Sequence, residues 1–484
     1  MTKRGRAQGS AQDLLPRREI LRRGVLGAAG LAAAPAALAA LPAVLAACKG
    51  TTPTPILRTL VTPNLTPPPP SPIPSLTGRL RVGDQIDGTV ALLRDIMPGL
   101  HDVDAAFAAR TGLAVTVNNK PAYDINAYLS SEPDDCTSHP YIHGFRLRFL
   151  GSTGLIAPLD DVWDVAKDNF SASVAEGVTG NDGHVYGIPF DCSPWVFFYR
   201  KSLWASNGYQ VPTTWTELLA LCERMQSGGN TPVAFADKDG WPALGTFDML
   251  NLRLNGYDFH IGLLAGKEKW TDQRVIAVFE AWRKLIPYYN GREASGVLPN
   301  QTWQEAATAL ESGQAGMFYF SLSLAGEFSG IDPTVVDDID FFEFPYFGNQ
   351  WDAEKVVEAP TGIWVMPSKS PTLQADRANA KAYLDFWARG STQLLMYAQR
   401  PGFIPTALDT DTSQLDRLSK KAFELVGGAQ HLTQFLDADT NPDFPGPGGM
   451  EGYLMAFFHD PTRDLAVFTQ SIQAFWDAMP PFEG

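Results

Sequence analysis

One stretch, residues 186–200, constrains the fold more than any other part of the chain. It has the pattern of a buried strand, is interrupted by Pro189 and Pro194, and resumes as a strand over residues 195–199. Proline cannot donate a hydrogen bond to a strand ladder, so no central strand runs unbroken through this stretch. The sheet must therefore end and restart here. We interpret the stretch as a crossover between two lobes that lines a cleft.

Composition and charge indicate a globular, acidic protein. The chain has 484 residues, enough for two or more domains, and is 45% hydrophobic and 19% charged. Its net charge is −15, and removing the seven basic and two acidic residues of the first 47 leaves 31 basic and 51 acidic residues. Such an acidic surface repels phosphate backbones, which argues against a nucleic-acid partner.

Residues 1–47 have the features of a signal peptide. A basic region contains Arg17 and Arg18, an uncharged apolar run follows over residues 24–47, and Leu-Ala-Ala-Cys ends at Cys48. The twin arginines resemble the export signal of proteins that cross the membrane already folded. Residues 45–48 resemble a bacterial lipobox, in which the cysteine is lipidated. The alternative is an uncleaved transmembrane anchor, because the apolar run is long enough to span a bilayer.

Lipidation of Cys48 would hold the protein at the outer surface of the cell membrane. The predicted linker, residues 48–78, contains nine prolines and seven threonines. This composition cannot build a core and favours extended polyproline conformations. We interpret the linker as a stalk between the membrane and the folded part.

The folded part predicts an α/β fold. Strands at residues 79–82 and 113–117 flank a helix around residues 103–109, which Gly112 ends. This alternation is typical of a largely parallel sheet that is covered on both faces. After the crossover the pattern is mostly helical. The elements predicted there are a helix opened by the capping box Thr214–Glu217, an amphipathic helix at 275–285, a helix at 303–310, strands at 232–235, 315–320 and 339–344, and a crossing at 359–366.

Several stretches together resemble the family 1 extracellular solute-binding proteins of carbohydrate ABC importers. The matching stretches are residues 132–135, 154–161, 186–190, 195–199, 212–218, 237–243, 313–317 and 358–360. The resemblance implies a periplasmic-binding-protein-like α/β fold, with two lobes, a hinge of two or three crossing strands and an inter-lobe cleft. A hinge of this kind closes on its ligand. The chain departs from the family after the first strand, where tryptophan is missing, and at Thr361, which follows Glu-Ala-Pro where the family often has aspartate.

The resemblance also implies the domain boundaries and the partners. We expect residues 79–193 plus 316–358 to form lobe 1, and residues 194–315 plus 359–484 to form lobe 2. The expected partners are a carbohydrate, the permease subunits of an ABC importer, and the membrane through Cys48. A monomer without a cofactor is expected.

A sugar presents an apolar ring face and a rim of hydroxyl groups, so its site needs aromatic side chains and polar groups that donate or accept. Tryptophans at the crossover, in loops and at helix starts fit the first need, and acidic residues near the crossings fit the second. Each also has a structural alternative, such as packing between lobes or helix capping. Arg146 fits a surface or ion-pair role better. The predicted ligand-binding residues are Asp135, Asp191, Trp195, Trp241, Trp303, Glu358 and Trp364.

Two other motifs suggest metal binding but lack essential features. Cys136, His139 and His143 could be soft metal ligands, but Pro140 disfavours the helix that would place both histidines on one face. Residues 437–443 alternate oxygen-bearing side chains as calcium loops do, but lack the glycine and glutamate of such loops. We expect no bound metal, and a solvated turn at residues 437–443.

With Cys48 lipidated, Cys136, Cys192 and Cys222 remain, and an odd set cannot all pair internally. A disulfide between Cys136 and Cys192 stays open as an alternative, whereas Cys222 falls inside an amphipathic helix and is expected in the core.

No catalytic motif is present among those tested, which include Gly-x-Ser-x-Gly, His-Glu-x-x-His and the Walker sequence. Adjacent acidic pairs such as Asp134–Asp135 could supply the two carboxylates of a glycosidase, so a surface-anchored glycoside-active enzyme is one alternative. A receptor for a non-sugar solute is another. The candidate stretches are poor in lysine and arginine, which favours a neutral ligand. We therefore predict a carbohydrate receptor without catalytic residues.

Overall fold

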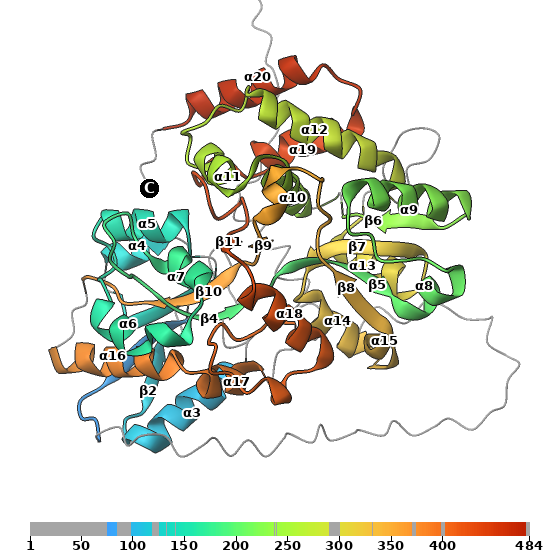
Figure 1. Ribbon diagram of the computed structural model, residues 1–484. Coiled ribbons are helices and arrows are strands. Elements are labelled where there is room, and N and C mark those ends of the chain that lie inside the picture. The colour runs from blue at the N-terminus through green and yellow to red at the C-terminus, as the bar shows by residue number, and fades with distance from the viewer. Residues whose placement is uncertain are drawn as a thin grey trace, which may run out of the picture.

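The computed structural model describes residues 75–84, 98–118, 125–131, 133–140, 142–236, 238, 240–289, 301–331, 333–369, 374–397 and 402–480. These residues form two α/β lobes, each built on a mixed sheet (Figure 1). The predicted fold class is therefore confirmed. The predicted signal peptide, Cys48 and most of the linker lie outside the described residues. Over the described ranges, none of the helices combines the length and apolar character needed to span a bilayer.

Lobe 1 contains a five-stranded sheet in the order β2-β1-β3-β10-β4. Its strands are β1 (Leu80–Asp84), β2 (Val115–Asn118), β3 (Cys136–Pro140), β4 (Ile188–Cys192) and β10 (Thr361–Val365). β1 runs parallel to β2 and β3, whereas β10 is antiparallel to both of its neighbours. The helices of this lobe are α3 (Gly99–Thr111), α4 (Ile125–Ser130), α5 (Phe145–Ser152), α6 (Asp160–Ala166), α7 (Ala172–Val178), α16 (Gln374–Trp387) and α17 (Gly390–Tyr397).

Lobe 2 contains a four-stranded sheet in the order β6-β7-β5-β8. Its strands are β5 (Trp195–Arg200), β6 (Thr231–Ala234), β7 (Ala315–Ser321) and β8 (Ile339–Phe342). β5 is antiparallel to β7 and β8, and only β6 and β7 run parallel. The helices are α8 (Lys201–Asn207), α9 (Trp215–Ser227), α10 (Pro242–Asn255), α11 (Tyr257–Leu264), α12 (Gln273–Leu285), α13 (Trp303–Glu311), α14 (Leu324–Ile331), α15 (Pro333–Asp338), α18 (Arg417–Gly427), α19 (Met450–His459) and α20 (Leu465–Ala478).

Local sequence signals account for several of these elements. Helix α3 ends where Gly112 adopts a left-handed φ of 75°, a conformation that favours glycine. Helix α9 begins with the predicted capping box of Thr214 and Glu217. The apolar stripe of α12 is buried against the core, as its 3.6-residue period predicts.

The crossover at residues 186–200 is confirmed. β4 ends at Cys192 in the lobe 1 sheet, and β5 begins at Trp195 in the lobe 2 sheet. Pro189 is tolerated because β4 is the last strand of its sheet, and the register with β10 shifts opposite it, between Gly362 and Ile363. A strand break in the sequence thus marks the passage between the lobes.

The predicted assignment of the returning segments was wrong. Residues 316–358 were expected in lobe 1, but β7 and β8 pair with β5 in lobe 2. Residues 359–397 were expected in lobe 2, but β10 completes the lobe 1 sheet between β3 and β4. The reason is that a segment belongs to the lobe whose sheet its strand joins. The local sequence pattern shows that a segment is a strand but not with which distant strand it pairs.

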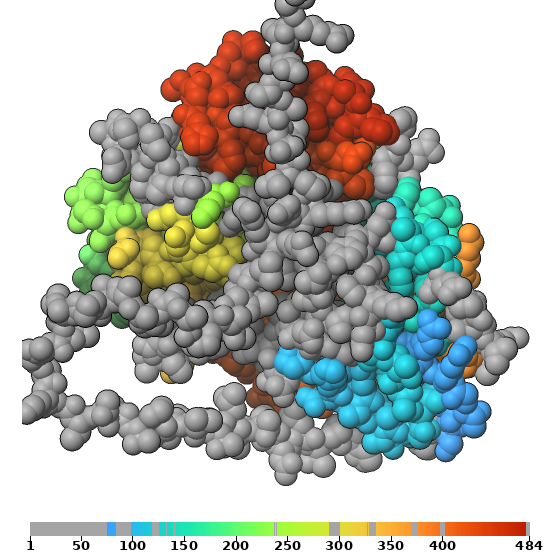
Figure 2. Space-filling model, turned by 180° about the vertical axis from the view of Figure 1, so that it is seen from behind, coloured from blue at the N-terminus to red at the C-terminus, as the bar shows by residue number. Residues whose placement is uncertain are grey.

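Three crossings join the lobes. The first crossing is residues 193–194 and the second is residues 359–360, and the Ser193 amide of the first donates to the Pro360 carbonyl of the second at 3.2 Å. The third runs from α17 in lobe 1 to α18, which is held against lobe 2 by an ion pair of Arg417 with Asp340 of β8 at 3.3 Å. Between the lobes, β9 (Val356–Glu358) pairs with β11 (His431–Thr433). Seen from behind, the blue-to-cyan part of lobe 1 and the green-to-yellow part of lobe 2 lie on opposite sides, with the red C-terminal helices above them (Figure 2).

Candidate functional site

Three of the predicted tryptophans come together at one edge of the lobe 2 sheet. Trp195 is the first residue of β5, Trp241 is the N-cap residue of α10, and Trp303 is the first residue of α13. They meet Phe320 near the end of β7 and Phe435 in the loop after β11. We call these five residues the aromatic cluster.

The rings of the aromatic cluster are in direct contact. Trp195 stacks on Phe435 with ring centroids 5.1 Å apart, and its centroid lies 5.0 Å from that of Phe320. Trp241 meets Trp195 edge-on at 6.2 Å. Trp303 stacks on Phe320 at 5.7 Å. Trp195 and the two phenylalanines are buried, whereas Trp241 and Trp303 are only partly buried.

Topology explains why this edge is suited to binding. β6 and β7 run parallel, so their carboxyl ends lie together, and the starts of α10 and α13 are at the same end. β5 begins there as well, because Trp195 pairs with Ser321 at the end of β7. Ligands of α/β sheets commonly bind beyond the carboxyl ends of strands. Trp195 also lies within the crossover from lobe 1, three residues after β4 ends at Cys192.

Glu358 is one of several buried polar residues next to the aromatic cluster. It is 0% exposed at the end of β9, and neither of its carboxylate oxygens has a hydrogen-bond partner among the described residues. Thr433 is its register partner on β11 and is equally buried, with an unpaired hydroxyl in the same part of the chain. Tyr319 lies near both: its ring centroid is 5.5 Å from that of Trp195, and burial and then the charge of Glu358 raise the pKa of its hydroxyl.

The buried acids have unusual protonation behaviour. Burial, and next the negative charges of Asp248 and Asp437, raise the pKa of Glu358 well above its usual range. Burial and then the charges of Asp439 and Asp437 do the same to the pKa of Asp248, although its carboxylate accepts the Leu436 amide at 2.9 Å. Burial therefore disfavours the ionised form of both Glu358 and Asp248.

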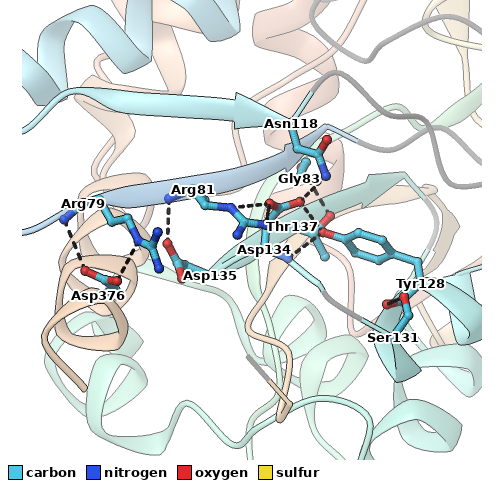
Figure 3. Close-up of polar contacts among 10 residues, drawn as sticks. All are labelled: Arg79, Arg81, Gly83, Asn118, Tyr128, Ser131, Asp134, Asp135, Thr137 and Asp376. Carbon is cyan, nitrogen blue, oxygen red and sulfur yellow. Dashed lines mark hydrogen bonds and ion pairs between the residues drawn. The ribbon is translucent and has the colours of Figure 1, made fainter. Parts of the chain in front are cut away.

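Asp135 lies apart from the aromatic cluster, at the amino end of β3. It was expected to end a strand, but β3 begins after it. Its carboxylate accepts the Arg81 backbone amide at 2.6 Å (Figure 3). The neighbouring Asp134 accepts two hydrogen bonds from the Arg81 guanidinium, one from Asn118 and one from the Tyr128 hydroxyl. This network connects β1, β2 and α4, so Asp134 and Asp135 have a structural role.

Asp191 and Trp364 also have partners inside lobe 1. Asp191 accepts the Gly362 amide at 3.0 Å, at the register shift between β4 and β10. A side chain at position 362 would collide with this carboxylate, so glycine is required there. Trp364 is fully buried among Phe190, Tyr383 and Trp387.

The metal and cysteine motifs have the following outcomes. Cys136, Cys192 and Cys222 are all buried and none of them is in a disulfide, so the alternative disulfide between Cys136 and Cys192 is not formed. His143 is buried against Gly177, and burial lowers its pKa to about 3. Across the described ranges, no three His, Cys, Asp or Glu side chains are placed to hold a metal ion.

The loop after β11 contributes residues that sequence reasoning missed. Phe435 belongs to the aromatic cluster, and Asp439 is 3% exposed and reaches lobe 1. Residues 437–443 were predicted as a solvated turn, which is wrong for Asp439 and Thr440 because both are buried. Arg146, predicted as a surface or ion-pair residue, is only partly buried and donates to the Asp437 carbonyl at 3.4 Å. A contact of this kind between distant segments has no local signal.

One cavity lies away from these residues. It has a volume of about 520 Å³ and lies between β8, β9 and α18, at the opposite edge of the sheet from β6. None of the seven predicted binding residues lines it.

Comparison with known proteins places the chain in a family. Residues 102–421 match the family model described as bacterial extracellular solute-binding protein. The chain belongs to this family. Solute-binding proteins of the family bind their ligands without transforming them, which confirms the prediction of a receptor and not an enzyme.

Individual relatives agree with the family assignment. The bacterial solute receptor AcbH is 33% identical in sequence, with a TM-score of 0.73 over 83% of this chain and 98% of AcbH. Its structural study describes an exclusive substrate preference for β-D-galactopyranose. The osmoprotective compounds-binding protein GgtB of Synechocystis is 32% identical over 56% of this chain and 65% of its own length. The ABC transporter extracellular-binding protein PH1214 of Pyrococcus horikoshii is 26% identical over 59% of this chain and 62% of its own length. The chain thus spans less than two thirds of either curated relative.

Proposed function

We propose that this solute-binding protein captures a neutral carbohydrate between its two lobes and delivers it to the permease of an ABC importer. The observation that carries the proposal is the aromatic cluster at the edge of the lobe 2 sheet, beside the crossover. Aromatic faces stack on sugar rings, and neighbouring polar groups bind the hydroxyl rim. The similarity to AcbH, a receptor for a galactopyranose, supports a sugar as the solute.

Four of the seven predicted residues remain proposed solute contacts. Trp241 and Trp303 are the proposed ring platforms, because each is partly exposed within the aromatic cluster. Trp195 supports them from behind, and Glu358 is the proposed polar group at the floor. Asp135, Asp191 and Trp364 are not included, because their partners are within the sheet and core of lobe 1.

Placement outside the cytoplasm follows from the family, and lipid anchoring is a further part of the proposal. The support is the sequence of residues 1–48, with twin arginines, an apolar run and a lipobox-like ending at Cys48. A lipidated Cys48 and a proline-rich stalk would keep the lobes close to the permease while leaving them free to close. The proposed membrane contact therefore uses the lipid, and the permease contact uses the folded lobes.

The test is ligand screening by thermal unfolding, followed by calorimetry. The panel contains mono-, di- and oligosaccharides, polyols and amino acids, with β-D-galactopyranose among the monosaccharides. Ligand at 100 times its dissociation constant stabilises a protein by about 2.7 kcal/mol, which raises the melting temperature by a few degrees. The expected result is stabilisation by a sugar that is recovered chemically unchanged. No stabilisation by any sugar, or a cleaved product, would contradict the proposal.

Matched tryptophan variants locate the site. Trp241→Ala is expected to weaken sugar binding at least tenfold, because a partly exposed stacking ring is lost. Trp476→Ala is the control, since Trp476 is also partly buried in lobe 2 but packs on Phe444 and Trp270, away from the aromatic cluster. Equal loss of affinity in both variants would remove the aromatic cluster from the proposal.

A further inference from the structure

The loop after β11 is in direct contact with lobe 1. Asp439 accepts the backbone amide of Phe145, the first residue of α5, at 2.5 Å. Helix α5 follows β3, so its N-terminus lies at the carboxyl end of the lobe 1 sheet. Helix α7 of lobe 1 packs against β11, and the two lie side by side in Figure 1. The contact therefore joins the two lobes at the sheet end where ligands commonly bind.

The residue before Phe145 is a glycine, which leaves room for the Asp439 carboxyl group. Gly144, the N-cap residue of α5, has a φ of 68° and no capping side chain of its own. A Cβ atom at Gly144 would lie only 2.5 Å from Asp439 Oδ1. Asp439 thus supplies from lobe 2 the acceptor that the N-terminus of α5 lacks, a role that the carbonyl oxygen of a protonated carboxyl group also fills. A second inter-lobe contact lies nearby, between His431 and Glu176 at 2.8 Å.

We propose that Asp439 is a proton-sensitive latch that holds lobe 2 against the N-terminus of α5 and favours the closed arrangement of the lobes as the pH falls. Closing buries this carboxyl group, and opening returns it to water. The inference depends on the contact between the lobes and not on the solute, so its failure would leave the proposed function untouched.

The charges that face Asp439 decide the sign of the effect. Burial is the largest influence and raises the pKa of Asp439 to about 7, against the Phe145 amide and then Arg148 and Arg146 of α5, which favour its ionised form. Its charge also acts on Asp248 of α10 and on Tyr257 of α11. Asp437 belongs to the same loop, and His431 and Glu176 form the neighbouring contact.

The expected size follows from proton linkage. In the open arrangement Asp439 would have the ordinary aspartate pKa of 3.8, whereas its pKa in the closed arrangement is about 7. Between pH 3.8 and 7 the closed form therefore binds one proton that the open form does not. Closure is therefore favoured below pH 7 and loses this contribution as the pH rises through 7. The ratio of closed to open protein is expected to rise about 25-fold between pH 7.5 and 5.5.

Energy transfer between dyes on the two lobes measures this ratio without ligand. Val165 of α6 and Val467 of α20 are 68% and 62% exposed and serve as cysteine positions. The full chain is used in detergent with Cys48→Ser, and the buried cysteines should react poorly with dye. The efficiency of energy transfer between the two dyes is expected to change from pH 7.5 to pH 5.5 as it would if the lobes close. A protein whose transfer does not change would overturn the proposal.

Three variants assign the response. Asp439→Asn keeps the shape and the acceptor oxygen but does not titrate, so its transfer should not depend on pH. Asp443→Asn removes the same charge from an exposed position of the same loop and should respond as the parent does. His431→Gln should also respond. A pH response that survives in Asp439→Asn, or one that disappears in His431→Gln, would overturn the latch.

A variant at Gly144 tests the same contact from lobe 1. Gly144→Ala places a methyl group against Asp439 and should shift transfer toward the open form at both pH values. Circular dichroism would confirm that the variant is folded. A folded Gly144→Ala protein with the transfer of its parent would contradict the latch.

Discussion

Replacing Glu358 with glutamine should make the folded protein more stable at neutral pH. The side chain is 0% exposed, and neither carboxylate oxygen has a hydrogen-bond partner among the described residues. Burial and the charges of Asp248 and Asp437 raise its pKa well above the usual value. Because burial in the folded protein disfavours the ionised form of this group, its deprotonation in the unfolded chain favours unfolding at neutral pH. Glutamine has nearly the same shape and carries no proton that can be lost.

The sign and size of the effect follow from linkage. A group whose pKa is raised by folding contributes stability that is complete below its unfolded pKa, here the ordinary 4.5, and is lost as the pH rises toward its folded value. Each pH unit in this range costs about 1.4 kcal/mol per proton. Between pH 5.5 and 7.5 the parent should therefore lose up to about 2.7 kcal/mol more than Glu358→Gln.

Denaturant unfolding at these two pH values measures the difference. The control is Glu280→Gln, since Glu280 is an exposed glutamate of α12, and its pH dependence should match that of the parent. The reasoning is refuted if Glu358→Gln and the parent lose equal free energy of unfolding between pH 5.5 and 7.5. A greater loss in the variant would also refute it.

Three further predictions concern the lobe 1 network, a helix cap and the membrane anchor. Asp134→Asn should destabilise the protein by about 1.5–3 kcal/mol in denaturant unfolding, because Arg81 loses a charged partner at 2.6 Å; an unchanged midpoint would contradict the structural role of this network. Thr214→Ala should cost about 1 kcal/mol in the same assay by removing the capping box of α9, and a loss no larger than that of an exposed threonine variant would contradict it. Cys48→Ala should abolish lipid attachment, as mass spectrometry of the N-terminus would show, and a mature wild-type protein that does not begin at Cys48 would exclude the lipoprotein.

The local elements of the fold were predictable because their signals are local. Gly112 ends α3, the Thr214 capping box opens α9, and the stripe of α12 is buried, each as expected from residues within one or two turns. The break at Pro189 and Pro194 correctly marked the passage between lobes. Family resemblance added the two-lobe architecture, which the periodicity of the chain does not contain.

The candidate site was predictable only in part. Tryptophans at the crossover, in a loop and at a helix start were singled out, and the structure brings Trp195, Trp241 and Trp303 into one cluster. Trp364 shows the same residue type and lies in the core of lobe 1. A tryptophan that packs and one that faces a neighbouring lobe have the same local sequence signal, because burial depends on what the rest of the chain places over the ring.

What the sequence determines by itself is therefore the identity and limits of the elements: where strands stop, where helices are capped, and where the lobes separate. Only the tertiary structure decides which lobe β7, β8 and β10 join, that Phe435 stacks on Trp195, and that Asp439 caps α5. Asp439 and Phe145 are 294 residues apart, and their contact exists only once both lobes have formed. Backbone conformation is set mainly by near neighbours, whereas pairing, burial and pKa depend on groups that folding brings together from distant parts of the chain.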